Sequence, residues 1–156
     1  MPATKTLFIF SLLAFFISSI AQTQTVKVID GDTIHLDGEK IRFSGIDAPE
    51  LNQTCNLHGI TNKCGEESKN LLSDKILKNE INCIREGKDQ YNRVLAECFI
   101  EGYSLSQYLV EEGYAFAYRQ YSKKFIIFEE DAQKKKKGMW AMEFIYPWEF
   151  RKIKSN

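Results

Sequence analysis

Apolar and polar residues alternate in short segments near the start of the chain. Residues 25–29 (TVKVI) alternate, residues 33–36 continue the pattern, and residues 40–46 follow after Asp37-Gly38. Such an alternation is typical of strands, and Asp-Gly between two of them is typical of a two-residue hairpin turn. Two later segments, 80–85 and 93–100, are predicted to pair through the polar turn EGKDQYN. The pattern therefore predicts five short strands.

Three helices are predicted from helical spacing and from end signals. Residues 66–78 carry apolar residues at helical spacing, and Ser104-x-x-Gln107 is a capping box that opens a helix ending at Gly113. Residues 122–137 have acids early and lysines late, as the helix dipole favours. Residues 51–64 are polar and are predicted to form a loop. A helix inserted between the third and fourth of five strands predicts an α+β fold, a five-stranded OB-type β-barrel with three helices.

The first 21 residues have a different pattern. One lysine precedes an apolar run over residues 7–17, and Ser19-Ile20-Ala21 follows. This is the layout of a secretory signal peptide. A membrane anchor is the alternative, but a spanning helix needs roughly 20 apolar residues. We expect residues 1–21 to be removed, leaving one domain over 22–156 that is periplasmic or secreted and free of the membrane.

Charge and cysteine content refine this expectation. The chain has 21 basic and 21 acidic residues, and loss of Lys5 with the signal peptide leaves 20 against 21. Bulk charge therefore does not indicate nucleic acid binding, and any basic surface must be local. The four cysteines favour disulfides in an exported chain, since no C-x-x-C pair suggests zinc. Of three possible connectivities we expect Cys55–Cys64 and Cys83–Cys98, because the second pair lies opposite across the predicted hairpin.

Acidic residues are predicted to meet at one end of the first hairpin. An antiparallel return through Asp37-Gly38 brings Asp47 to the end of the sheet that carries Asp30 and Asp32. Two such charges about 5 Å apart repel by about 3 kcal/mol at an effective dielectric near 20, which favours a bound cation or a protonated acid. Oxygen ligands favour calcium or magnesium, and the spacing does not match an EF-hand. Asp30 is expected to stabilise a turn.

Two arginines and a glutamate complete the candidate site. Arg42 lies in the returning strand, and Arg93 opens the fifth strand. Guanidinium groups bind phosphate through paired hydrogen bonds, and Glu50 is the acid left over for proton transfer. A cation, two arginines and a carboxylate base together suit phosphodiester hydrolysis.

The motifs IDGDT, IRFSGIDAPE, DQYNR and GMW, in this order, resemble the staphylococcal (thermonuclease-like) nuclease family. The resemblance covers residues 25–140, and the tail with the four cysteines looks like an exported bacterial branch. It implies a calcium-dependent nuclease that cleaves DNA and RNA to products with a 3′-phosphate. Asp32 and Asp47 would then bind Ca²⁺, together with the main-chain carbonyl of Ala48, where the family often has threonine.

The resemblance also implies roles for the remaining residues. Glu50 would be the base or would orient the water, and Arg42 and Arg93 would bind the scissile phosphate. Tyr91 and Tyr118 correspond to nucleotide-contacting tyrosines, and Gln90 stands where the family often has lysine.

Two other functions remain open from the sequence. One is an OB-fold protein that binds nucleic acid and has lost catalysis, although the complete set of acids and arginines argues against it. The other is an exported, calcium-stabilised domain with a protein partner. In the nuclease interpretation the partner is the nucleic acid substrate, and we expect a monomer.

Overall fold

The structure is a computed structural model that describes residues 23–77 and 79–155. The predicted signal peptide, residues 1–21, lies outside the described residues. Over the described ranges, no helix has both the length and the apolar character needed to cross a membrane.

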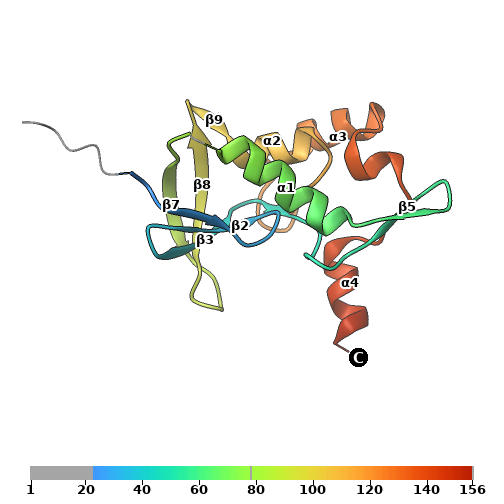
Figure 1. Ribbon diagram of the computed structural model, residues 1–156, viewed down its shortest axis with the longest axis horizontal. Coiled ribbons are helices and arrows are strands. Elements are labelled where there is room, and N and C mark those ends of the chain that lie inside the picture. The colour runs from blue at the N-terminus through green and yellow to red at the C-terminus, as the bar shows by residue number, and fades with distance from the viewer. Residues whose placement is uncertain (1–22, 78, 156) are drawn as a thin grey trace, which may run out of the picture.

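The five predicted strands form the main sheet. They are β1 (Val26–Val28), β2 (Thr33–Leu36), β3 (Glu39–Phe43), β7 (Asn82–Lys88) and β8 (Val94–Ile100), and their spatial order is β1-β2-β3-β8-β7 (Figure 1). Neighbours pair antiparallel except for β3 and β8, which are parallel. A short sixth strand, β9 (Tyr103–Ser104), pairs with β8. This order is OB-like, as predicted.

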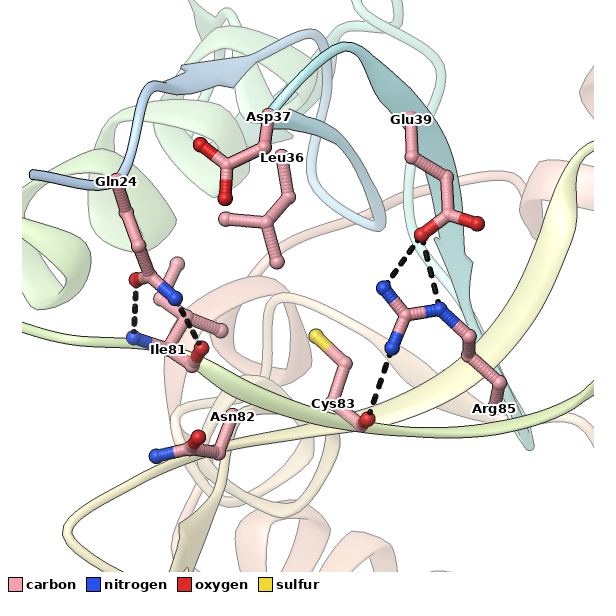
Figure 2. A pocket seen from close by; sticks show the side chains of 8 residues that line it. All are labelled: Gln24, Leu36, Asp37, Glu39, Ile81, Asn82, Cys83 and Arg85. Carbon is pink, nitrogen blue, oxygen red and sulfur yellow. Dashed lines mark hydrogen bonds and ion pairs between the residues drawn. The ribbon is translucent and has the colours of Figure 1, made fainter. Parts of the chain in front are cut away.

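The sheet is not a closed barrel, because no strand pairing joins β1 to β7 in the described chain. The side-chain amide of Gln24 bridges this gap, as Figure 2 shows. Its Nε2 donates to the Ile81 carbonyl at 2.9 Å, and its Oε1 accepts from the Ile81 N–H at 2.8 Å. A pocket of about 330 Å³ opens beside the bridge, toward Glu39 and Arg85. One amide side chain thus replaces the missing ladder between the two edge strands.

The prediction of three helices is wrong, since the described chain has four α-helices. They are α1 (Cys64–Ile76), α2 (Leu105–Glu111), α3 (Ile126–Lys134) and α4 (Pro147–Lys154), with a 3₁₀ turn at Gly138–Ala141. The unexpected helix α4 starts with proline in its first turn and ends with basic residues, both of which favour a helix. In Figure 1 it lies well away from β7, at the other end of the molecule.

The helix predicted over residues 122–137 is shorter at both ends. The Ser122 hydroxyl accepts from the Lys124 N–H in a local turn, so the helix begins only at Ile126. At the other end Lys136 has φ +51°, which a right-handed helix does not allow. The capping box is half formed: Ser104 Oγ accepts from the Gln107 N–H, but the Gln107 side chain donates to Glu111.

The loop predicted over residues 51–64 contains a hairpin. Strands β5 (Cys55–Leu57) and β6 (Ile60–Asn62) pair through His58-Gly59, both at positive φ. A second small sheet pairs β4 (Ile46–Asp47) with β10 (Phe116–Ala117). Each of its strands has only three residues, which is too short for the apolar alternation that marks a half-buried strand.

Two apolar clusters hold these elements. The larger joins the main sheet to α1, α2 and α3. The smaller surrounds the buried ring of Phe116 with aromatic side chains from the last part of the chain: Tyr114, Trp140, Phe144, Tyr146 and Trp148. This second cluster anchors the start of α4.

Both disulfides have the predicted connectivity. Cys55–Cys64 joins β5 to the start of α1, and Cys83–Cys98 joins β7 to β8 across the hairpin. Their Cα–Cα distances are 5.8 and 4.0 Å. The described cysteines include no free thiol.

Candidate active site

The β2–β3 hairpin places Asp32 beside Arg42. Asp37 and Gly38 form its two-residue turn with φ of +50° and +85°, so Leu36 faces Glu39 and Thr33 faces Arg42. The Asp32 carbonyl accepts from the Phe43 N–H at 2.8 Å, directly beyond that pair. The turn chemistry of the sequence therefore fixes which residue lies opposite the acidic cluster.

The second acid reaches the site because the chain turns sharply after β3. Gly45 has φ +73°, and a Cβ there would approach the Phe125 ring at 2.8 Å, so this turn favours glycine. Strand β4 then carries Asp47 opposite Phe116. The next N–H, that of Ala48, donates to Asp32 Oδ2 at 2.9 Å. The two acidic clusters thus meet, as the sequence predicts.

Arg42 lies between the two carboxylates and is almost fully paired. Its Nη2 is 3.2 Å from Asp32 Oδ2 and 2.9 Å from Asp47 Oδ1. Its Nη1 donates to the carbonyls of Phe43 and Ile46, both at 2.9 Å. Only 12% of the side chain is exposed, and these bonds fix the position of the guanidinium.

Arg151, on α4, contacts the candidate site, and the sequence reasoning did not predict this. Its Nη2 is 2.7 Å from Asp47 Oδ2, and its Nη1 is 3.1 Å from Asp47 Oδ1. The same Nη1 is 2.8 Å from Glu50 Oε1. The signals that predict α4, Pro147 and the basic last turn, could have located the helix. They do not mark Arg151 apart from its basic neighbours.

Burial and charge act against each other on the acids of this site. The pKa of Asp47 is raised overall. Burial and the charge of Asp32 raise it, and together they outweigh Arg151 and Arg42, which lower it. Burial and then the charge of Asp32 raise the pKa of Asp30 to about 6. Asp30 Oδ1 accepts from the Asp32 N–H at 3.1 Å, which is the turn-stabilising role predicted for it.

Glu50 projects from a loop that is packed tightly against the start of α1. Its carbonyl accepts from the Gln53 N–H at 2.7 Å, and a Cβ at Gly65 would lie only 1.9 Å from that oxygen. The Oε1 of buried Gln53 accepts from the Glu50 N–H, and its Nε2 donates to the Ile145 carbonyl. The backbone of Glu50 is therefore held, while 39% of its side chain remains exposed.

Arg93 lies in the β7–β8 turn and has a different partner. Its Nε is 2.6 Å from Asp89 Oδ2, and its guanidinium lies 5.4 Å from the centre of the Tyr91 ring. Burial acts to raise the pKa of Asp89, but hydrogen bonds from Arg93 and the Tyr91 N–H lower it overall. Over residues 23–77 and 79–155, no hydrogen bond or ion pair links Arg93 to Asp47 or Glu50.

The two tyrosines predicted to contact nucleotides lie on different elements and have different neighbours. Tyr91 is 71% exposed in the turn just described. Tyr118 follows β10, and its N–H donates to the Gly45 carbonyl at 2.9 Å. Its ring lies parallel to that of Trp148 on α4, with ring centres 6.5 Å apart. Both tyrosines present aromatic surface, but on different elements.

The donor set of the site suits a hard divalent cation. The carboxylates of Asp32 and Asp47 both lie within 3.2 Å of the Arg42 Nη2. Carboxylate oxygens are the ligands that Ca²⁺ and Mg²⁺ prefer. The described part of the chain contains no ready group of three or more His, Cys, Asp or Glu side chains for a metal. The arginines instead neutralise the two acids.

Comparison with known proteins identifies the family. The family described as staphylococcal nuclease homologue matches residues 40–142, which is more than half of the chain. The chain belongs to the staphylococcal nuclease family. The match contains Arg42, Asp47, Ala48, Glu50 and Arg93; Asp32 lies before it.

Individual relatives agree with this membership. An "Uncharacterized endonuclease" of Haemophilus influenzae is 33% identical over 145 residues, covering 88% of this chain and 76% of the relative. A "Micrococcal nuclease" of Shigella flexneri is 26% identical, covering 85% and 82%. The "Succinoglycan biosynthesis protein ExoI" of Rhizobium meliloti is 36% identical over 92 residues, and the match spans only 48% of it. Membership in this nuclease family supports a nuclease function in general.

Proposed function

We propose that the protein is an exported, calcium-dependent phosphodiesterase that hydrolyses DNA and RNA and leaves 3′-phosphate ends. The observation that carries the proposal is the meeting of Asp32, Asp47 and Arg42 in a family of nucleases, with Glu50 beside them. The names of two relatives, an endonuclease and a micrococcal nuclease, support nucleic acid as the substrate.

In this proposal Asp32, Asp47 and the Ala48 carbonyl hold the calcium ion. A bound divalent cation supplies positive charge next to the phosphate. Arg42 is fixed beside both acids, and a cation that bound their carboxylates would release the Arg42 Nη2 to donate to a phosphate oxygen. Arg93 is the second guanidinium, and it must leave Asp89 to reach the same phosphate.

Glu50 is the proposed base. It accepts a proton from the attacking water, whose oxygen forms the new bond to phosphorus. The bond to the 5′-oxygen breaks, this oxygen takes up a proton, and the phosphate stays on the 3′-oxygen. The partly exposed side chain and fixed backbone of Glu50 suit a group that must meet water in a defined place.

Substrate contacts and location follow from other features. Tyr91 and Tyr118 are proposed to stack on bases, because both present aromatic rings beside basic groups or other rings. The two disulfides support export to the periplasm or the medium. We propose that the protein acts as a monomer.

The decisive experiment is a digestion of single- and double-stranded DNA and RNA with calcium, with magnesium or with a chelator, followed by end-group analysis. The proposal expects cleavage in calcium, none in chelator, and 3′-phosphate ends. Tight binding without cleavage under every metal condition would instead favour the inactive nucleic-acid-binding protein. Calcium-dependent melting without binding or cleavage would favour a calcium-stabilised partner-binding domain.

A further inference from the structure

Arg151 contacts carboxylate oxygens of Asp47 that a bound cation would also use. It contacts both oxygens of Asp47, at 3.1 and 2.7 Å, and the same guanidinium reaches Glu50 at 2.8 Å. Asp47 Oδ1 is also 2.9 Å from Arg42, so neither oxygen of this buried carboxylate is free of a guanidinium partner. Paired guanidinium–carboxylate contacts of this kind are among the stronger ones in proteins.

The helix that carries Arg151 is anchored at one end only. Pro147 is buried, and the Trp148 ring stacks on Tyr146 at 4.5 Å within the Phe116 cluster. From Arg151 to Ser155 every residue is exposed. The contacts of Arg151 with Asp47 and Glu50 are therefore the polar link that holds the last turns of α4 over the site.

From these contacts we propose that Arg151 is an internal competitor of the divalent cation. It neutralises Asp47 and covers Glu50, so a cation can reach these oxygens only when the last turns of α4 withdraw. The inference deepens the proposed function, because it assumes the same cation site at Asp32 and Asp47. It predicts that nuclease activity is off until the cation concentration is high enough to displace the arginine.

The charge balance gives the direction of the effect. With Arg151 in place, two guanidinium groups face the three carboxylates of Asp32, Asp47 and Glu50. Without it, one guanidinium faces the three carboxylates, so the site is more negative and favours a divalent cation more strongly. When two groups compete for one site, each lowers the binding affinity of the other by the same factor. Removing the arginine must therefore strengthen cation binding.

The test is a calorimetric titration of CaCl₂ into the protein lacking residues 1–21, without substrate. Arg151→Gln is expected to bind calcium about tenfold more tightly than the unchanged protein, a typical size for coupling between two ligands. Arg151→Lys, which can contact only part of the carboxylate, should lie between them. Lys154→Gln is the matched control: it removes a positive charge from the same exposed end of α4, and should change the affinity less than twofold.

A second readout follows α4 itself. Trp140→Phe leaves Trp148, at the base of α4, as the sole tryptophan. Calcium should change its fluorescence in this background, and much less when Arg151→Gln is added. Circular dichroism spectra establish that each variant is folded.

The outcomes separate this inference from the proposed function. If the protein binds calcium and cleaves with it, but Arg151→Gln binds calcium equally or more weakly, the competition is refuted and the nuclease proposal stands. If no folded variant binds calcium, the cation site is wrong and both proposals fail.

Discussion

At the scale of single residues, the site depends on how a buried carboxylate is neutralised. Asp47 is fully buried, and burial raises its pKa, so its charge needs partners. Arg42 supplies one from the neighbouring strand, and Arg151 supplies another from more than 100 residues away. Glu50 differs, because among the described residues only Arg151 forms an ion pair with its partly exposed side chain. It can change position at little cost to the fold.

Glu50→Gln should therefore separate catalysis from folding. We expect kcat to fall by about 10²- to 10⁴-fold, since the amide cannot accept the proton of water, while the melting temperature hardly changes. Steady-state cleavage rates and thermal melts measure the two effects. Glu130→Gln, at an exposed position of α3, is the control and should alter neither. An active Glu50→Gln protein would remove Glu50 from the proposed mechanism.

Arg93 is proposed to act on the transition state after it leaves Asp89. Arg93→Gln should lower kcat much more than it raises KM, because the lost contact forms mainly with the charge that develops during reaction. Kinetics over a range of substrate concentrations give both constants. A rise in KM with unchanged kcat would mean that Arg93 only binds substrate.

At the scale of elements, local signals in the sequence predict hairpins and turns, but they do not predict contacts between residues far apart in the chain. Asp37-Gly38 fixes the first hairpin, and with it the approach of Asp32 to Arg42, so this half of the site was predictable. The contact of Arg151 with Asp47 was not. It depends on how the aromatic residues before α4 pack on Phe116, and no local pattern encodes that packing.

The edge of the sheet gives an element-scale prediction. The prediction of a closed barrel was wrong where β1 and β7 do not pair, and Gln24 makes two bonds to Ile81 instead. Gln24→Ala leaves the Ile81 N–H and carbonyl without these partners, so we expect the free energy of unfolding to fall by about 1–2 kcal/mol. Urea denaturation measures it, with exposed Gln90→Ala as the control. Equal midpoints for the two variants would mean that water replaces the bridge.

At the scale of the whole molecule, two disulfides fix elements that carry or adjoin proposed site residues. Cys83–Cys98 staples the β7–β8 hairpin, whose turn holds Arg93. Cys55–Cys64 fixes β5 to α1, next to the loop that carries Glu50. Their connectivity was predictable for Cys83–Cys98 because Cys83 faces Cys98 in the strand register. The hairpin between Cys55 and Cys64 was missed because each of its strands has only three residues and its turn, His58-Gly59, is not a common signal.

Removing the disulfides should have unequal effects on stability and activity. Loops closed over 9 and 15 residues contribute about 2–3 kcal/mol each, so Cys83→Ala/Cys98→Ala and Cys55→Ala/Cys64→Ala should both melt at lower temperature. The Cys55–Cys64 bond lies beside the Glu50 loop. At a temperature where both variants remain folded, we expect only Cys55→Ala/Cys64→Ala to reduce kcat. Melting curves and cleavage rates under identical conditions distinguish the two effects. Equal losses of kcat would show that the Cys55–Cys64 bond does not position the Glu50 loop, and that Gln53 and Gly65 are sufficient to hold it.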